Sequence, residues 1–172
     1  TALLATVAFA TSVASKAARV VEAAAGRTVI EFGARRAHGV GASLAAARAA
    51  FIGGCDGTSL VEAGHRYGIP TSGTMAHSWV QTFANEVDAF REFSRTFPES
   101  ATYLLDTYDT LAATDHLIAS GLAPRMVRLD SGEVISLSRQ VRAKLDAAGL
   151  TSTRIFATGD LDEYRIATIV KE

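Results

Sequence analysis

One histidine, His77, stands in a turn of small residues at positions 72–79, SGTMAHSW, where an imidazole can meet a ligand. The turn follows a short apolar segment and precedes a helical pattern, so backbone N–H groups that stabilise an anion are expected beside the ring. An imidazole in that setting can accept a phosphoryl group or act as an acid or base. The alternative is a histidine that only bonds the local backbone, which is the commoner situation for a lone histidine.

Two aspartates, Asp106 and Asp130, each end a short apolar run. Paired carboxylates can orient a histidine, hold Mg²⁺ through water, or stabilise a developing positive charge. The arginines Arg35, Arg36 and Arg128 lie in similar turns and suit the capture of a carboxylate or phosphate. Helix capping by the acids and salt bridging between acids and arginines explain these residue types equally well.

Weaker signals come from a glycine turn and an aromatic ring. Gly159 and Asp160 stand where a strand is expected to meet a helix, so their amides can face a phosphate or a ribose. Phe32 offers a flat face for an aromatic ligand, or fills the core. No cysteine–histidine spacing of a metal site, phosphate-binding P-loop or dinucleotide glycine fingerprint is present, so no metal-ligating residues are predicted.

Hydrophobic periodicity predicts alternating strands and helices that present these turns at one rim. Helices are expected over residues 3–25, 43–51, 58–67, 79–97, 111–119, 134–148 and 161–170, and strands over 28–32, 70–73, 103–105, 126–129 and 153–157. This alternation is typical of βα units on a parallel sheet, whose sites lie at the carboxyl ends of the strands. We therefore expect an α/β fold, an incomplete parallel β/α barrel of five or six strands with an Ala-rich N-terminal helix, forming a single domain over residues 1–172.

Composition limits the partners of this domain. The 172 residues carry a net charge of −1 and are 48% hydrophobic, which argues against both disorder and nucleic-acid binding. The one cysteine, Cys55, excludes an internal disulfide and fits a cytoplasmic location. The apolar run 1–14 lacks a preceding basic region and is too short for a membrane span, so a buried helix and no membrane partner are expected.

Six motifs in this order and spacing resemble the nicotinate phosphoribosyltransferase family, from about Leu3 to the end of the chain. They are EFGARRAHG (31–39), GGCDGTS (53–59), GTMAHS (73–78), LDTYDT (105–110), RLDSG (128–132) and GDLDE (159–163). The resemblance implies transfer of a phosphoribosyl group from 5-phosphoribosyl-1-pyrophosphate to nicotinate for NAD synthesis. ATP hydrolysis is coupled to this transfer, and Mg²⁺ is bound with the phosphates.

The resemblance also implies roles for single residues. His77 takes the phosphoryl group of ATP and Asp106 orients it, while Asp130 approaches the ring and ribose as a third catalytic residue. Phe32 stacks on the pyridine ring. The remaining substrate-binding positions are Arg35, Ser59, Thr74, Arg128, Ser131, Gly159 and Asp160.

Ser59 bears on the choice of substrate. In nicotinamide-using relatives an aspartate stands at the matching position, and it would repel the carboxylate of nicotinate by about 1 kcal/mol or more at short range. Serine tolerates the acid, so nicotinate is favoured over nicotinamide. An enzyme that acts on nicotinamide or quinolinate is the alternative among the enzymes.

The family's N-terminal domain, which completes the site across a dimer, and its later phosphate-gripping loop have no counterpart in these 172 residues. We therefore expect a homo-oligomer, with this chain alone inactive or weakly active. A non-catalytic fragment or degenerate paralogue that associates with a complete subunit is the alternative from another class.

Overall fold

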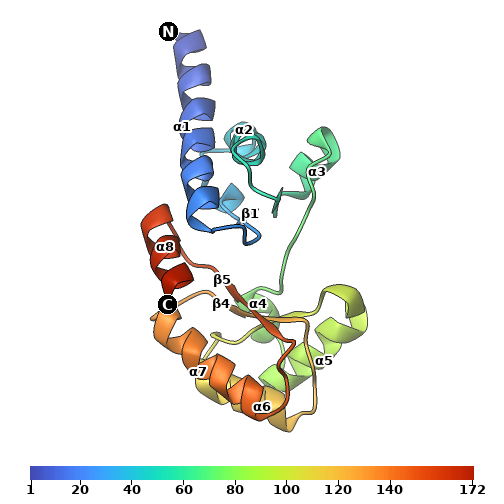
Figure 1. Cartoon of the computed structure of the whole chain (residues 1–172). Coiled ribbons are helices and arrows are strands. Elements are labelled where there is room, and N and C mark those ends of the chain that lie inside the picture. Colours follow the sequence, from blue (N-terminus) through green and yellow to red (C-terminus); the bar gives the residue numbers. More distant parts are fainter. The chain divides into compact units, whose positions relative to one another are not determined.

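The computed structural model describes all 172 residues, which form two compact units. The first unit contains residues 1–73 and 161–172, and the second contains residues 74–160. Both units are built from parallel strands and helices in alternation (Figure 1).

Two long helices and a pair of very short strands organise the first unit. Its elements are α1 (Ala2–Ala23), β1 (Ile30–Glu31), the 3-10 turn η1 (Ala34–Arg36), α2 (Val40–Ile52), β2 (Gly57–Thr58), α3 (Val61–Tyr67) and α8 (Glu163–Lys171). Strands β1 and β2 pair in parallel, and Thr58 forms one further bridge to Thr71. The strand expected over 70–73 is therefore reduced to a single bridge, and β2 was not expected because two residues carry no periodic signal.

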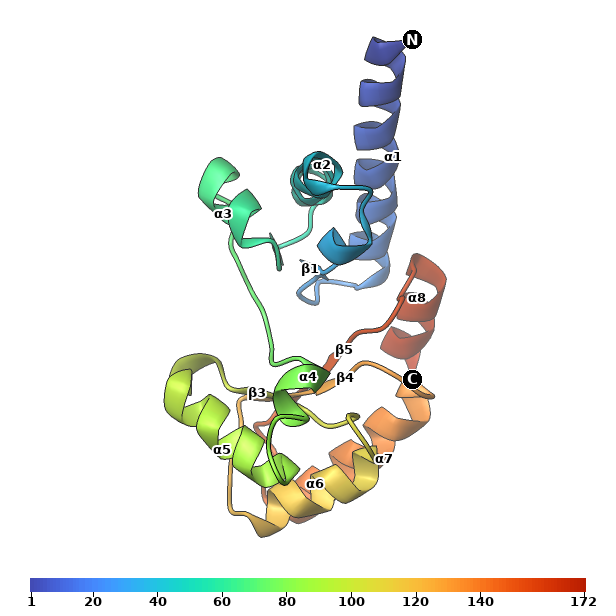
Figure 2. The same cartoon turned by 180° about the vertical axis from the view of Figure 1, so that it is seen from behind.

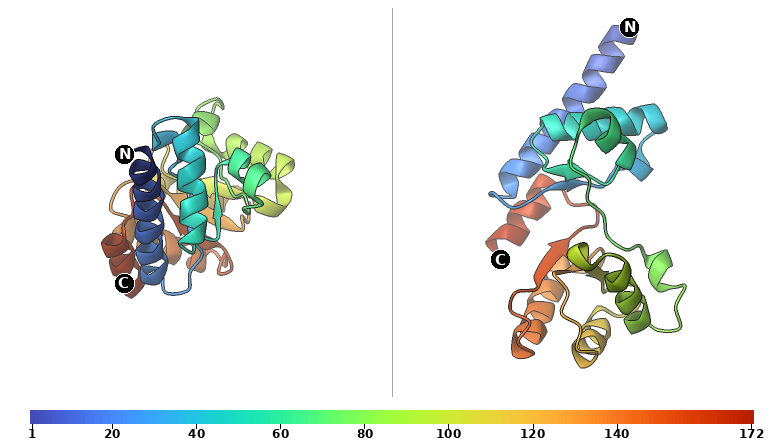
Figure 3. Two further views of the ribbon diagram at one scale, coloured as in Figure 1. Left: turned by 90° about the horizontal axis from the view of Figure 1, so that it is seen from above. Right: turned by 90° about the vertical axis from the view of Figure 1, so that its right-hand side faces the viewer.

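Small residues let α1 and α2 lie side by side (left panel of Figure 3). A Cβ on Gly53 would lie 2.5 Å from the carbonyl oxygen of Ala14, a distance that only glycine permits. Ala17 of α1 packs with Ala50 and Cys55 at this contact. Small side chains, rather than large apolar ones, thus hold the two helices together.

The Ala-rich N-terminal helix is confirmed, but its expected burial is wrong. Only Ala17 of α1 is buried, whereas Leu3 and Leu4 are 77% and 74% exposed, because packing against α2 involves the second half of the helix. The helix continues to Ala23, so by length and composition it could cross a membrane. A buried core helix of a soluble protein and an N-terminal signal sequence meet the same criterion.

The second unit is a three-stranded parallel sheet with helices between its strands (Figure 2). Its elements are α4 (His77–Val80), α5 (Glu86–Thr96), η2 (Pro98–Ser100), β3 (Thr102–Leu104), α6 (Thr110–Ala119), β4 (Met126–Leu129), α7 (Val134–Ala147) and β5 (Arg154–Ala157). The strand order β3-β4-β5 places Tyr103 beside Val127, and Val127 beside Ile155. The strands and helices predicted for 103–157 are confirmed to within two residues.

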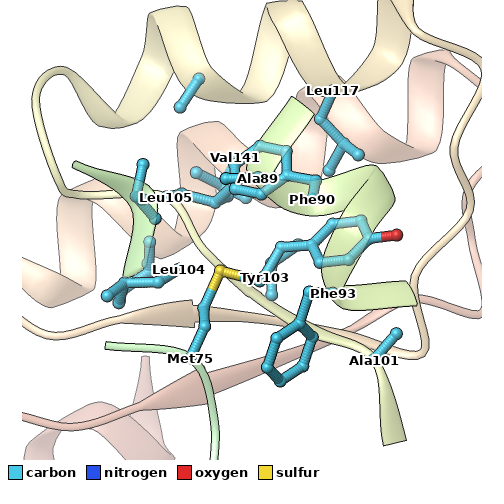
Figure 4. Packing of buried hydrophobic residues seen from close by; sticks show 14 of the residues in the cluster. Met75, Ala89, Phe90, Phe93, Ala101, Tyr103, Leu104, Leu105, Leu117 and Val141 are labelled. Carbon is cyan, nitrogen blue, oxygen red and sulfur yellow. The ribbon is translucent and has the colours of Figure 1, made fainter. Parts of the chain in front are cut away.

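The core of this unit lies between the sheet and its helices (Figure 4). The rings of Phe90 and Tyr103 stack with centroids 4.8 Å apart. Around them pack Leu104, Leu105, Leu117, Leu129, Val127, Val141 and Leu145, each almost completely buried. Continuous apolar strands of this kind are typical of parallel sheets that are covered by helices.

The single helix expected over 79–97 is wrong, since a turn separates α4 from α5. Asn85 caps α5 by accepting the amide proton of Asp88 at 3.0 Å, and the indole N–H of Trp79 donates to the carbonyl of Ala89 at 3.1 Å. The aromatic spacing still has a packing cause, because Trp79 contacts both Phe83 and Phe93 in the core. A polar cap inside an apolar pattern therefore decides where the helix breaks.

Candidate active site

His77 is the first residue of α4, and its side chain lies between two polar groups of the second unit. Its Nδ1 lies 3.3 Å from the Thr107 hydroxyl, two residues after the expected strand 103–105. Its Nε2 lies 3.6 Å from Oδ2 of Asp130, which directly follows β4. The side chain is 40% exposed, so the ring is both oriented and open to a ligand. The expected helix N-terminal anion site is weak, because α4 has only four residues.

Arg128 is a buried cation that contacts the same aspartate as this histidine. Its guanidinium donates to Asp130 Oδ1 at 2.6 Å, to the Thr158 hydroxyl at 2.9 Å and to the Thr74 hydroxyl at 2.9 Å. The side chain is only 10% exposed. The interpretation of Arg128 as a member of a salt bridge thus holds in this structure, and its predicted contact with substrate stays a prediction.

The same contacts set the charge of Asp130. Burial alone would raise its pKa, but the hydrogen bonds from Thr158 and the guanidinium of Arg128 hold the pKa of Asp130 below its ordinary value, with His77 adding to the effect. Asp130 is therefore an ionised carboxylate at neutral pH. It can hold a donor proton on Nε2 of His77 or face a developing positive charge.

Asp106 has different partners from those expected. Its Oδ2 accepts the backbone N–H of Asp130 at 3.0 Å and the Ser131 hydroxyl at 2.5 Å, which fixes the turn after β4. In this structure the carboxylate beside His77 belongs to Asp130, and the predicted orienting role of Asp106 stays a prediction. The other oxygen, Oδ1, is buried without a hydrogen-bond partner.

Gly159 closes the site at the end of β5. Its φ of +95° lies in the region that favours glycine, and a Cβ there would lie 2.1 Å from the carbonyl oxygen of Asp130. Asp160 follows, exposed and with φ of +50°. The turn after β5 thus packs directly on the turn after β4, as the prediction of a common rim requires within this unit.

The first unit holds the other three predicted residues near one another in its own framework. Phe32 and Ser59 directly follow the last paired residues of β1 and β2, and Arg35 lies exposed in η1. The N–H of Ser59 donates to the carbonyl of Glu31 at 2.8 Å. Phe32 and Ser59 therefore lie at the same carboxyl-terminal edge of the β1–β2 pair, as expected for parallel strands.

Two functional candidates were missed from the sequence, Thr107 and Thr158. Thr158 directly follows β5 and Thr107 lies three residues after the end of β3, but threonine is common in strands and gives no signal of its own. Their adjacency to Asp106 and Gly159 in the motifs was the one available indication.

No group of three or more histidine, cysteine, aspartate or glutamate side chains is arranged to hold a metal ion. The residues present do not form a complete protein site for Mg²⁺.

Comparison with known proteins decides the family. The domain family described as quinolinate phosphoribosyl transferase, C-terminal domain, matches residues 13–172. The chain belongs to this family.

Nicotinate phosphoribosyltransferases are among the similar proteins. The chain is 52% identical over 163 residues to nicotinate phosphoribosyltransferase pncB2 of Mycobacterium tuberculosis (strain ATCC 25618 / H37Rv), covering 91% of this chain and 35% of that protein. It is 42% identical over 176 residues to the nicotinate phosphoribosyltransferase of Bacillus subtilis (strain 168), covering 98% of this chain and 36% of that protein. It thus spans about a third of the length of these relatives, and the predicted resemblance is confirmed.

A solved structure supports the fold. The crystal structure of nicotinate-nucleotide pyrophosphorylase from Pyrococcus furiosus matches 95% of this chain and 44% of its own, with a TM-score of 0.85 and 32% identity. The α/β class and the partial parallel β/α barrel are confirmed by this likeness to the phosphoribosyltransferase domain family. The chain has five assigned strands, against the eight of a closed barrel.

Proposed function

We propose that this chain carries part of the site that transfers a phosphoribosyl group from 5-phosphoribosyl-1-pyrophosphate to nicotinate, giving nicotinate mononucleotide and pyrophosphate in NAD biosynthesis. The observation that carries the proposal is the His77 imidazole, held between Thr107 and Asp130 at the strand ends. Membership of the phosphoribosyl transferase family and 52% identity to a nicotinate phosphoribosyltransferase support it.

In the transfer step the ring nitrogen of nicotinate bonds to C1 of the ribose while the C1–O bond to pyrophosphate breaks. The departing oxygen keeps the electron pair, and the carbon becomes cationic in the transition state. A carboxylate held ionised, such as Asp130, stabilises that charge. Phe32, Arg35 and Ser59 would bind the pyridine ring and its carboxylate.

We further propose that ATP drives the reaction through His77. A ring nitrogen attacks the γ-phosphorus of ATP, an N–P bond forms, and the P–O bond to the β-phosphate breaks with its electron pair leaving on ADP. Water later cleaves the N–P bond and releases phosphate. Thr107 and Asp130 hold opposite sides of the ring and restrict its rotation during the attack. We place the reaction in the cytoplasm, consistent with one unpaired buried cysteine.

Labelled ATP tests this proposal. We expect the chain, incubated with Mg²⁺ and ATP labelled at the γ-phosphate, to acquire an acid-labile label that His77→Ala abolishes. His65→Ala, which changes an exposed histidine of α3, is the matched control and should keep the label. An unlabelled wild-type chain would contradict the phosphohistidine and favour a non-catalytic fragment.

A further inference from the structure

The carboxylate of Glu31 joins two segments of the first unit that are far apart in sequence. Its Oε1 accepts the backbone N–H of Gly33, at the start of the turn that carries Arg35. Its Oε2 accepts the hydroxyl of Thr58 at 2.6 Å, across the β1–β2 pair. One carboxylate therefore fixes the position of the turn after β1 relative to the end of β2.

Thr58 extends this contact to the backbone around Ser59. The Thr58 side chain is completely buried, and its oxygen accepts the N–H of Leu60 at 3.1 Å while its proton goes to Glu31. The N–H of Ser59 itself donates to the Glu31 carbonyl at 2.8 Å. The backbone on both sides of Ser59 is thus hydrogen-bonded, directly or through Thr58, to Glu31.

The glycine after Phe32 fits the same arrangement. A Cβ on Gly33 would lie 3.0 Å from Glu31 Oε1, tighter than side chains normally tolerate, so a larger residue would push the carboxylate away. Its φ is not in the glycine-favouring region, so closeness to Glu31 is the visible reason for glycine. The spacing Glu-Phe-Gly therefore serves the carboxylate contact.

We infer that Glu31 is a positioning residue that fixes Ser59 relative to the Phe32–Arg35 turn and thereby sets the discrimination between nicotinate and nicotinamide. This inference rests on the proposed function, because it assigns those residues to the pyridine ring. Each carboxylate oxygen of Glu31 accepts one of the two donors, the Gly33 N–H and the Thr58 hydroxyl. A glutamine has one acceptor oxygen, and its NH₂ group leaves the Gly33 or Thr58 donor without a partner.

The test compares E31Q and T58V with T58S, which keeps the hydroxyl, and with E62Q, which changes a partly exposed acid of α3 that pairs with Arg66 on the same helix. We expect E31Q and T58V to speed amide hydrogen exchange at Ser59 and Leu60 by about tenfold, with E31Q doing so at Gly33 too. The ratio of nicotinate to nicotinamide affinity, measured by ligand-observed NMR, should fall by roughly fivefold. T58S and E62Q should match the wild type in both measurements.

The outcomes separate this inference from the proposed function. Unchanged exchange in E31Q overturns the positioning role, whatever the chain binds. Faster exchange with an unchanged affinity ratio overturns the role in specificity. If the wild-type chain binds neither base while E31Q loosens these amides, the proposed function fails and the positioning role stands.

Discussion

Hydroxyl side chains at the strand ends decide how the charged residues of this chain can act. Thr107 holds one ring nitrogen of His77, and Thr158 donates to Asp130. The Thr158 hydroxyl accepts from Arg128 and donates to Asp130, so it joins two oppositely charged groups. At the residue scale the candidate site is a hydrogen-bonded network rather than a set of independent groups.

Ser59 offers a direct test of substrate choice. We expect Ser59→Asp to shift the preference of the chain from nicotinate toward nicotinamide by about tenfold, because a second carboxylate repels the acid and accepts a hydrogen bond from the amide. Ligand-observed NMR with each base measures the change. Ser59→Asn is the neutral control, and an equal shift in both variants would show that charge is not the cause.

The buried carboxyl group of Glu86 affects stability rather than the candidate site. Burial raises the pKa of Glu86 above its ordinary value, the nearby His116 partly offsets this, and Asp109 adds to it. One oxygen of Glu86 is buried without a partner. Its ionisation therefore costs stability, and this cost grows as the pH rises through the raised pKa.

We expect Glu86→Gln to increase the free energy of unfolding at pH 7 by up to about 1 kcal/mol, with a smaller effect near pH 4. Urea denaturation at the two pH values measures this difference. Glu99→Gln, on the exposed turn η2, should change neither value. A loss of stability at pH 7 would mean that the contact with His116 outweighs burial.

Caps and close turns set the boundaries of the elements. Asn85 separates α4 from α5, and so decides that His77 begins a short helix of its own. Asn85→Ala should lower the free energy of unfolding by about 1 kcal/mol, because the amide of Asp88 loses its acceptor. Asn85→Ser, which keeps a capping oxygen, should recover most of this loss in the same denaturation experiment.

Gly159 tests the contact between the turns after β4 and β5. Gly159→Ala should cost about 2 kcal/mol or more, since the added methyl group meets the Asp130 carbonyl in addition to the backbone strain. Gly149 has a similar positive φ of +79°, and a Cβ there would meet no atom within 4 Å, so Gly149→Ala reports the strain alone, about 1 kcal/mol. Equal losses in the two variants would argue against a close contact at Gly159.

At the scale of the whole molecule, the chain spans about a third of its curated relatives. We expect the chain alone to form nicotinate mononucleotide at least about a hundredfold more slowly than a complete relative assayed in parallel, because positioning of both substrates needs a complete site. The sheet β3-β4-β5 has two edge strands, and edges of this kind favour association, so we also propose a homo-oligomer. Chromatographic analysis of product gives the rate, and a rate near that of the complete relative would contradict the first expectation.

The alternation of apolar strands and helices was readable from the sequence because buried parallel strands are short, continuous and apolar. The same sequence pattern located Asp106, Asp130 and the turn of Gly159 shortly after strand ends, since helix and strand periods differ. His77 instead begins α4, because only a single bridge at Thr71 remains of the strand that was expected before it. The break at Asn85 was hidden by the continuous aromatic spacing on both sides of a local cap, and the two-residue strand β2 is too short for a periodic signal. The exposure of α1 could not be predicted, because it depends on packing against α2. The tertiary structure also decided that Asp130 is the carboxylate that faces the imidazole, and that Arg128 is buried against Asp130. These contacts form only when the strands lie side by side, because hydrogen-bond partners must be close in space.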